Sequence, residues 1–403
     1  MSDVVVIGGG QAGSSLVSRL RSKGFDGKIT LICGEADLPY QRPPLSKAYL
    51  LGEMERERLY LRPDSYYAEQ KIEVLCGTPV TAIDRTAKTV SLGDRSIPYD
   101  MLALTTGSVP RRLPATIGGD LGNVFTVRGL ADVDAMAPEM QAGRHVLIVG
   151  GGYIGLEAAA VAAKMGLNVT LVELSDRILQ RVAAPETSDY FRRVHRDHGV
   201  VIREKTGLTR LIGTDRVAQA ELGDGTVLDV DLVIVGVGIV PDVALAEAAG
   251  LTVENGIVVD NMGRSSDPAI WAAGDCAIFP GPEGPMRLES VQNAIDQAEA
   301  VADNMMGAEA PYAPKPWFWS DQYDVKLQIA GLNSGYDRIV RRGTADEGTL
   351  SFWYYRGDRL IAVDALNDSR AYMVGKRLIE SGKSPNPEAV TNPETDLKAL
   401  LKA

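Results

Sequence analysis

Two glycine-rich segments have the spacing of a turn that binds a dinucleotide. Each follows a short apolar run and precedes a helix-like stretch, so strand, turn and helix come in the order that such a site requires. The first glycine permits the tight turn, the second lets the backbone approach a pyrophosphate, and the third lets the helix pack on the strand. The phosphates then lie at the positive end of the helix. The glycines are Gly8, Gly10 and Gly13 in the first segment, and Gly150, Gly152 and Gly155 in the second.

An acidic residue ends the apolar run that follows each segment. Glu35 stands 27 positions after the first glycine of its segment, and Glu173 stands 23 positions after that of the second. A carboxylate there can hold ribose hydroxyls and would repel a 2′-phosphate, so Glu173 favours NAD over NADP at the second segment. Arg177 and Arg181 lie close enough in sequence to weaken that preference. Glu157, just inside the second helix-like stretch, fits two roles equally well: a first-turn acid that favours the helix dipole, or a contact to the nicotinamide.

The elements that must position these groups form a β-turn-α-β pattern twice, with starts 142 positions apart, which is a domain-sized offset. Helices are expected at Ser14–Lys23 and Leu156–Met165, and second strands at Ile29–Cys33 and Val169–Val172. Further strand-like runs are Val90–Leu92, Met101–Leu104, Leu232–Val235, Ile257–Val259 and Ile270–Ala272. After Pro314 the chain turns aromatic and β-like, and a helix-like pattern follows at Ala371–Ile379, so we expect a third domain of α+β type.

Composition excludes several classes of protein. The 403 residues carry a formal charge of −11, which disfavours binding to a nucleic-acid backbone. The three cysteines form no CxxC pair, so no redox dithiol is predicted, and three histidines argue against a metal site. No apolar run reaches 18 residues and no basic leader precedes Val4, so we expect a cytoplasmic protein without a membrane span. His195 and His198 are expected to be solvated, and Cys276 to be a packed thiol.

Two segments resemble flavoprotein reductases that contain two dinucleotide-binding domains. Trp271–Ala277 is similar to their second flavin fingerprint, in which a strand ends in Gly-Asp and the aspartate binds the ribityl chain of FAD, and Leu104–Gly107 is similar to their ATG turn. The segments flank the second glycine motif, so the resemblance implies a FAD-binding domain split by an inserted NAD-binding domain. The implied boundaries are 1–110 and 242–316 for the FAD-binding domain, 111–241 for the NAD-binding domain and 317–403 for a C-terminal interface domain.

Four segments look like the narrower family of oxygenase-coupled NADH:ferredoxin reductases, which have the fold of glutathione reductase. They are Arg42–Leu50, Gly150–Glu157, Glu289–Ala294 and Trp317–Tyr323. The fold class implied is α/β, with two Rossmann-like domains, one inserted in the other, plus a C-terminal α+β domain. The implied activity passes hydride from NADH to FAD and then single electrons to a [2Fe-2S] ferredoxin. That ferredoxin would serve a haem monooxygenase or a ring-hydroxylating dioxygenase; the oligomeric state, monomer or dimer, stays open.

The resemblance also implies site residues. At the reacting centre it implies Lys47, Glu157 and Trp319; a lysine near the ring stabilises negative charge on reduced flavin. Without the resemblance, Lys47 would be read as a surface lysine and Trp319 as a core aromatic. The positions implied at FAD are Gly8, Gly10, Ala12, Gly13, Glu35, Arg42, Pro43, Lys47, Val80, Thr106, Gly107, Arg128, Gly274, Asp275, Val291 and Trp319. Those implied at NAD are Gly150, Gly152, Tyr153, Ile154, Gly155, Glu157, Glu173 and Gly238.

Two alternative functions are compatible with the same pair of dinucleotide-binding domains. An NADH oxidase or peroxidase, or a disulfide reductase, would carry a reactive cysteine after the first β-turn-α-β unit, but residues 36–75 contain none. A redox-sensing flavoprotein similar to apoptosis-inducing factor shares the Pro-Pro-Leu-Ser-Lys segment, but we expect neither a targeting sequence nor long insertions in this protein. We therefore expect the ferredoxin reductase.

Overall fold

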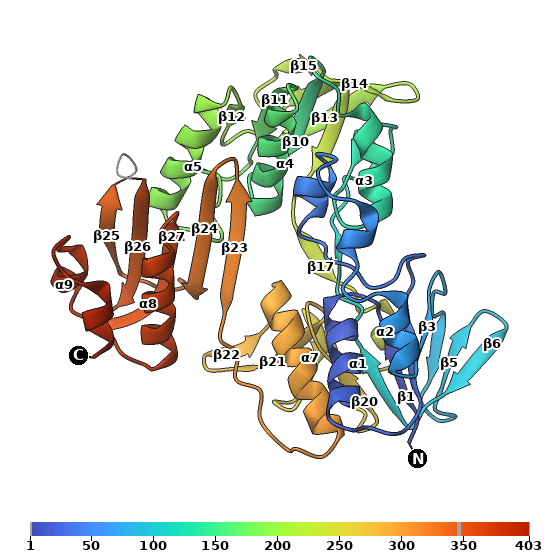
Figure 1. Cartoon of the computed structure of the whole chain (residues 1–403). Coiled ribbons are helices and arrows are strands. Elements are labelled where there is room, and N and C mark those ends of the chain that lie inside the picture. Colours follow the sequence, from blue (N-terminus) through green and yellow to red (C-terminus); the bar gives the residue numbers. More distant parts are fainter. Residues whose placement is uncertain (1, 345–347, 403) are drawn as a thin grey trace. The chain divides into compact units, whose positions relative to one another are not determined.

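The computed structural model describes residues 2–344 and 348–402 and divides the chain into two compact units (Figure 1). The first unit comprises Met1–Arg42, Glu55–Val109 and Ile239–Lys315. The second comprises Pro43–Met54, Pro110–Gly238 and Pro316–Ala403. The short strands β8 (Ser108–Pro110) and β17 (Ile239–Pro241) lie where the chain passes between units.

The first unit is built on a five-stranded parallel sheet in the order β20-β7-β1-β2-β3. Strands β1, β2, β7 and β20 are largely buried and mostly apolar, as parallel strands covered by helices are, whereas the edge strand β3 is only partly buried. The bounds are β1 (Val4–Ile7), β2 (Ile29–Ile32), β3 (Ile72–Leu75), β7 (Met101–Leu104) and β20 (Ile270–Ala272). The central strand β1 leads directly into the first glycine segment and helix α1 (Gln11–Ser22).

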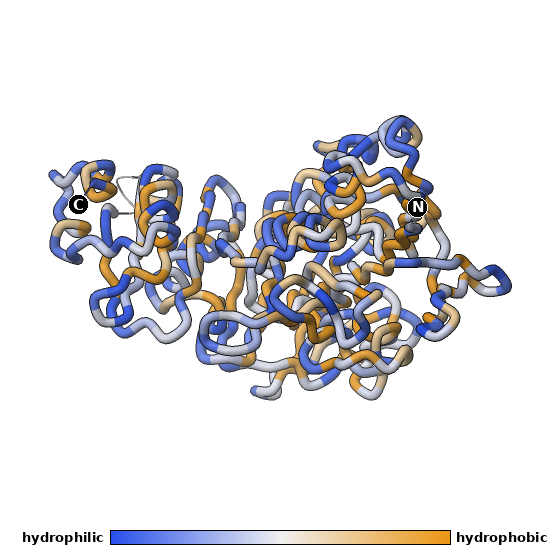
Figure 2. Tube along the Cα trace, turned by 90° about the horizontal axis from the view of Figure 1, so that it is seen from below, coloured by the Kyte–Doolittle hydropathy of each residue, from blue (hydrophilic) through white to orange (hydrophobic). Residues whose placement is uncertain are grey.

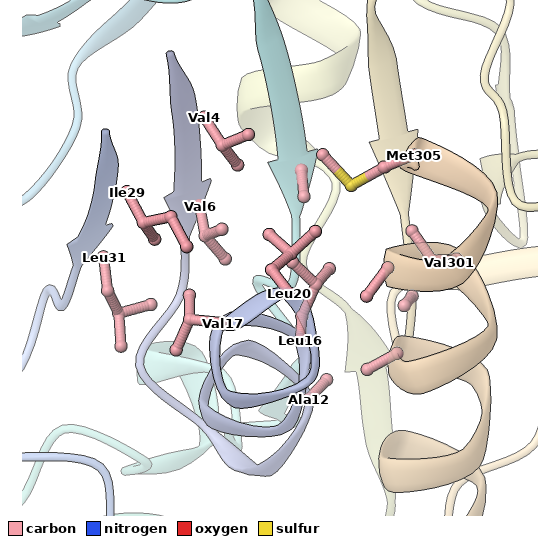
Figure 3. Close-up of a cluster of buried hydrophobic side chains, with 14 of the residues drawn as sticks. Val4, Val6, Ala12, Leu16, Val17, Leu20, Ile29, Leu31, Val301 and Met305 are labelled. Atoms are coloured by element: carbon pink, nitrogen blue, oxygen red, sulfur yellow. The ribbon is translucent and has the colours of Figure 1, made fainter. Parts of the chain in front are cut away.

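Helices α1 and α7 (Val291–Met305) pack beside each other on this sheet. Figure 3 shows Leu16 and Leu20 of α1 converging with side chains of β1 and β2 and with Val301 and Met305 of α7. The unit also contains the helices α2 (Asp64–Glu69) and α6 (Ala244–Ala248) and the turn η2 (Arg56–Leu59). One small sheet consists of β4 (Ala82–Asp84), β5 (Thr89–Leu92) and β6 (Arg95–Pro98). A second consists of β18 (Val253–Glu254), β19 (Gly256–Val258), β21 (Ala277–Gly281) and β22 (Gly284–Met286).

The second unit repeats the design with a parallel sheet in the order β12-β11-β10-β16-β9. The strands are β9 (Val124–Phe125), β10 (His145–Val149), β11 (Asn168–Val172), β12 (Val201–Arg203) and β16 (Leu232–Val235). The other elements here are α3 (Leu130–Met136), α4 (Tyr153–Lys164), α5 (Pro185–Asp197), the turns η1 (Leu45–Tyr49), η3 (Ala115–Ile117) and η4 (Ala137–Glu139), and a hairpin sheet of β13 (Leu208–Gly213), β14 (Val217–Leu222) and β15 (Val227–Asp229). Strand β10 leads through the second glycine segment into α4, as β1 leads into α1.

The second unit also holds an antiparallel sheet in the order β23-β24-β27-β26-β25. Helix α8 packs on it against β24 and β27, around buried residues such as Trp353, Val363 and Leu378 (Figure 1). The bounds are β23 (Trp317–Gln322), β24 (Val325–Gly331), β25 (Arg338–Thr344), β26 (Thr349–Arg356), β27 (Arg359–Leu366), α8 (Ser369–Glu380), α9 (Pro387–Thr391) and η5 (Leu397–Leu401).

The fold class predicted from sequence is confirmed: two Rossmann-like parallel sheets accompany an α+β C-terminal part. Helices α1 and α4 begin three residues before the expected starts, because each begins at a glycine without a side-chain cap, so the sequence carries no capping signal. One expectation was wrong. His195 is completely buried, because α5 is amphipathic and turns Phe191 and His195 to its packed face, whereas His198 is exposed.

Short hydrophobic runs alternate with hydrophilic ones along the chain (Figure 2). Within residues 2–344 and 348–402, no helix combines the length and the apolar character needed to cross a membrane.

Candidate functional site

In the first glycine segment, the outer glycines are fixed by the fold. Gly8 has a φ of +114°, and a Cβ there would lie 2.2 Å from the carbonyl oxygen of Thr105. A Cβ on Gly13 would lie 2.0 Å from the carbonyl oxygen of Gly8, so α1 can approach β1 only without a side chain at this position. These contacts are those expected for the tight turn and for the helix–strand packing.

Gly10 differs from its neighbours because nothing in the fold requires it to be glycine. Its φ is −85°, and beyond its neighbours no heavy atom of the described chain lies within 4 Å of a Cβ built there. It is the N-terminal cap of α1, where the first backbone N–H groups have no partner within the helix. Open space beside such N–H groups suits a pyrophosphate, so the residues present fit the flavin dinucleotide that the sequence predicts.

Glu35 and Arg42, both predicted at FAD, form an ion pair in the first unit. The Arg42 Nη2 atom lies 2.5 Å from Oε1 of Glu35, and the hydroxyl of Tyr40 donates to the other carboxylate oxygen. The Glu35 side chain is nonetheless 44% exposed. It therefore keeps accessible lone pairs with which it can accept hydrogen bonds from ribose hydroxyls.

Other predicted FAD residues come from distant parts of the chain and meet in the first unit. The Thr106 hydroxyl donates to the carbonyl of Asp242 at 2.6 Å, and Gly107, with a φ of +73°, completes that turn. A Cβ on Gly274 would lie 3.1 Å from Cβ of Ala12, so both residues must be small.

The Gly-Asp segment and helix α7 complete the predicted FAD residues of this unit. Asp275 accepts a hydrogen bond at 3.0 Å from the hydroxyl of Ser108. Val291 begins α7 directly after its cap Ser290, and Val80 packs against the core on the other face of the sheet. Of the other residues predicted at FAD, Pro43, Lys47, Arg128 and Trp319 belong to the second unit.

The second glycine segment has the same construction as the first. Gly150 has a φ of +109°, its Cβ would meet the carbonyl of Gly236 at 2.4 Å, and a Cβ on Gly155 would meet the carbonyl of Gly150 at 2.0 Å. Gly152 again faces open space. The apolar side chain of Ile154, 44% exposed at the start of α4, is what a bound nucleotide would cover. These residues fit a pyridine dinucleotide.

The acid after β11 is tied to the glycine segment. One oxygen of Glu173 accepts from the backbone N–H of Gly151 and the other from that of Ser175, both at 2.7 Å. Arg177 donates to the carbonyl of Ala183 at 2.8 Å and to a serine of α5, so it is committed to the fold. One of the two arginines that weakened the preference for NAD is thus engaged elsewhere. The other, Arg181, is exposed and comes within 3.6 Å of a Cβ built on Gly238, a predicted NAD residue.

Lys47 and Glu157 form a largely buried ion pair in the second unit. The ammonium lies 3.1 Å from Oε1 of Glu157, and their side chains are 19% and 9% exposed. Ser320 donates to Oε1 at 2.7 Å, and Ser46 donates to Oε2 at 3.3 Å. Burial raises the pKa of Glu157, whereas the charge of Lys47 acts in the opposite direction, and Asp321, 3.6 Å from Lys47, reinforces the rise. Lys47 is therefore not a surface lysine, and Glu157 is not an exposed first-turn acid.

Aromatic residues of β23 lie near this pair. The rings of Trp317 and Trp319 are 5.5 Å apart, and the ring of Phe318 lies 5.0 Å from that of Tyr153 at the start of α4. Trp319 is only partly buried, so it does not behave as an ordinary core aromatic. Its predicted role beside the flavin stays a prediction.

Two polar residues of β23 were missed by sequence reasoning. Ser320 contacts Glu157 directly, and Gln322 contacts Ser320; both are completely buried. The only signal in the sequence is that Ser320 and Gln322 are two positions apart in a strand-like segment, so they point to the same face of the sheet.

The structure brings together two cysteines that are 43 positions apart. Cys33 and Cys76 follow the neighbouring strands β2 and β3, and each thiol affects the pKa of the other. A Cβ on Gly9 would lie 2.2 Å from Sγ of Cys33. Burial raises the pKa of both thiols, so they are poor nucleophiles. Sequence spacing missed this pairing, while the prediction for Cys276, a buried thiol whose pKa is raised by burial, is confirmed.

A second buried carboxylate, Asp364 of β27, lies behind the NAD segment. It accepts hydrogen bonds from Thr187, at 2.9 Å, and from Tyr354, and its charge contributes to the raised pKa of the buried Tyr153 hydroxyl. Burial raises the pKa of Asp364 from 3.8 to about 6. The folded protein therefore binds this proton more tightly than the unfolded chain, and the contribution to stability is fully present below pH 4 and is lost as the pH rises through 6.

We expect Asp364→Asn to be more stable than the parent protein at pH 8, by about 3 kcal/mol for a shift of about two pKa units, with roughly half of that advantage left at pH 5. Thermal denaturation at several pH values measures this. Asp358→Asn, an exposed aspartate on the turn before β27, is the matched control and should show no pH-dependent gain. A constant difference between Asp364→Asn and the parent from pH 5 to 8 would contradict the assignment.

Comparison with known proteins identifies the family. The family model described as pyridine nucleotide-disulphide oxidoreductase matches residues 2–298, and the model described as reductase C-terminal matches residues 317–401. A ferredoxin–NAD(P)(+) reductase from Sphingomonas is 46% identical over 99% of this chain and 97% of its own length. Putidaredoxin reductase from Pseudomonas putida is 41% identical over 100% of this chain and 97% of its own length.

Solved structures agree with these matches. The crystal structure of the covalent putidaredoxin reductase–putidaredoxin complex contains a chain with a TM-score of 0.96 and 40% identity, over 100% of this chain and 98% of that chain. The chain therefore belongs to the pyridine nucleotide-disulphide oxidoreductase family, as an enzyme that uses FAD and NAD(P)H and whose relatives are ferredoxin reductases.

Proposed function

We propose that the protein is a FAD-dependent reductase that passes electrons from NADH to a [2Fe-2S] ferredoxin serving a haem monooxygenase or a ring-hydroxylating dioxygenase in the cytoplasm. The observation that carries the proposal is the pair of glycine segments, each with an open central glycine at a helix N-terminus. They provide separate places for a flavin dinucleotide and a pyridine dinucleotide. The full-length similarity to ferredoxin reductases supports the choice of electron acceptor.

The balanced reaction is NADH plus two oxidised ferredoxins giving NAD⁺, two reduced ferredoxins and one proton. The bound flavin supplies the chemistry that joins its two halves, because it accepts two electrons together as hydride and gives them up singly. The chain itself binds and orients the cofactors. We propose that Gly8, Gly10 and Gly13 hold the FAD pyrophosphate, and that Gly150, Gly152 and Gly155 hold that of NADH.

We further propose that Lys47 and Glu157 act at the reacting centre, with Trp319. A buried ammonium can stabilise negative charge that develops near it, and the Glu157 carboxylate at 3.1 Å keeps that ammonium in one place. No side chain is required to take a proton in the hydride step. The preference for NADH is supported by Glu173 and by the engagement of Arg177 within the fold, whereas the exposed Arg181 acts against it.

The proposal is tested with the flavin-loaded protein, NADH and a panel of purified ferredoxins. We expect NADH to bleach the flavin absorbance and at least one [2Fe-2S] ferredoxin to be reduced at a rate well above that of oxygen consumption. A rubredoxin and free hydrogen peroxide serve as alternative acceptors. Fast turnover with oxygen or peroxide and none with any [2Fe-2S] protein would instead identify an oxidase or peroxidase.

A further inference from the structure

A chain of buried hydrogen bonds leads from helix α5 to the carboxylate of Glu157. Nε2 of His195 lies 2.8 Å from Oε1 of Gln322, and Nε2 of Gln322 lies 3.1 Å from Oγ of Ser320. Ser320 in turn donates to Glu157 at 2.7 Å. At the other end, the hydroxyl of Tyr323 lies 3.2 Å from Nδ1 of His195. All five residues belong to the second unit.

In this series of hydrogen bonds, each residue donates to the next residue on the way to Glu157. The Gln322 amide donates to Ser320, so its carbonyl oxygen faces His195 and must accept from Nε2–H. Neutral His195 then has an unprotonated Nδ1, which accepts from the Tyr323 hydroxyl. Aligned hydrogen bonds polarise one another, and this series ends on a carboxylate, so each member strengthens the last bond to the negative charge.

Burial makes the arrangement costly to leave incomplete. His195, Gln322 and Ser320 are all 0% exposed, and a buried polar atom without a partner destabilises the fold. Burial lowers the pKa of His195 to about 4, with Gln322 acting to raise it and His198 acting to lower it further. The imidazole is therefore neutral throughout the physiological range, as the direction of the chain requires.

The outer end of the chain carries backbone strain. Tyr323 has a φ of +56° in the two-residue turn between β23 and β24, a backbone region that a bulky side chain rarely occupies. Its ring stacks on that of His198 at 3.7 Å between centroids while its hydroxyl reaches His195. The hairpin turn thus fixes the backbone of Tyr323, and its hydroxyl reaches His195 from this position.

We propose that Gln322 and His195 are positioning residues that act through Ser320 to keep the Glu157 carboxylate ionised and turned toward Lys47. The consequence for hydride transfer rests on the proposed function, in which Glu157 and Lys47 act at the reacting centre. A protonated Glu157 would no longer hold the ammonium by charge. Of the groups around the carboxylate, Lys47, Ser46 and Ser320 favour its charged form, and Asp321 opposes it.

The first test detects the hydrogen bonds of His195 by NMR and does not depend on catalysis. In flavin-loaded protein labelled with ¹⁵N-histidine, only three imidazoles contribute signals, and His145→Gln and His198→Gln assign them. We expect His195 to show the neutral Nε2–H tautomer from pH 8 down to pH 5.5. We also expect Glu157→Gln, which replaces the charged acceptor, to shift its Nε2–H resonance while the exposed His145 stays unchanged. The opposite tautomer, or a His195 resonance that is insensitive to Glu157→Gln, overturns the proposal.

The second test measures the pH dependence of flavin reduction by NADH in stopped flow. Gln322→Met keeps the length of the side chain but removes both hydrogen bonds, so the carboxylate should take up its proton at higher pH. We expect reduction to be severalfold slower than in the parent at pH 6, because Ser320 loses the hydrogen bond that orients it toward the carboxylate, and to recover toward the parent rate at pH 9. His145→Gln, at an exposed position away from the chain, should follow the parent at every pH.

A purely structural role for Gln322 predicts a different pattern. The melting temperature of Gln322→Met would fall, but its profile of rate against pH would superimpose on that of the parent after correction for the folded fraction, which overturns the proposal. If NADH fails to reduce the flavin even in the parent protein, the proposed function is wrong. The histidine spectra then still decide whether the series of hydrogen bonds from His195 to Glu157 exists.

Discussion

Gly10→Val is expected to give a folded protein that carries almost no flavin. A Cβ at this position meets no atom of the described chain within 4 Å beyond its neighbours, and the φ of −85° suits valine. The branched side chain would instead occupy the space in which the pyrophosphate must approach the backbone. The ratio of flavin absorbance to protein absorbance after purification should fall below about one tenth of the parent value, and added FAD should not restore it.

The matched comparison is Gly13→Val, in the same segment. There the Cβ would lie 2.0 Å from the carbonyl of Gly8, so the packing of α1 on β1 fails and the protein should lose both its flavin and its thermal stability. Gly10→Val should lose at most about 1 kcal/mol, the cost of a poorer helix cap. Full flavin content in Gly10→Val would remove the first glycine segment from the FAD site.

Gly152→Val is expected to keep the yellow cofactor and lose the response to NADH. Gly152 occupies in the second segment the place that Gly10 occupies in the first, with open space around its Cβ. We expect the apparent dissociation constant for NADH in flavin reduction to rise by about two orders of magnitude, equivalent to about 3 kcal/mol. Photochemical reduction of the flavin, which needs no nucleotide, should proceed as in the parent.

The two central-glycine variants are controls for each other. Gly10→Val should retain NADH binding, measured by calorimetry, while Gly152→Val should retain FAD. If Gly152→Val lost FAD and Gly10→Val lost NADH affinity, the assignment of the two dinucleotides to the two segments would be reversed.

The parts of the fold that local patterns determine could be predicted from the sequence. The glycine spacing located both turns, and the continuous apolar runs located β1, β2, β7, β10, β16 and β20. The chain passes between the compact units after Val109 and Gly238, and Pro43–Met54 also belongs to the second unit, so the domain boundaries expected from the sequence stay a prediction. The separation of the nucleotide-binding and C-terminal parts of the second unit at 316/317 remains a prediction.

The parts that depend on contacts between distant segments could not be predicted. Nothing near His195 in sequence indicates that Gln322, 127 positions away, satisfies it in a buried site. The same holds for Cys33 and Cys76, which meet only because β2 and β3 are neighbours. The pairing of Lys47 with Glu157 spans 110 positions, and only the resemblance to ferredoxin reductases pointed to these two residues together.

The excursion of Pro43–Met54 out of the first unit constrains how reductases of this kind can be recombined. A chimera that exchanges only 110–238 and 316–403 between two relatives would leave the twelve-residue segment Pro43–Met54 of one parent packed against helices of the other. Lys47 would then face a foreign carboxylate environment even though both exchanged modules were intact. To stay functional, a hybrid should therefore exchange residues 43–54 together with 110–238 and 316–403. These three separate stretches of the gene must come from the same parent.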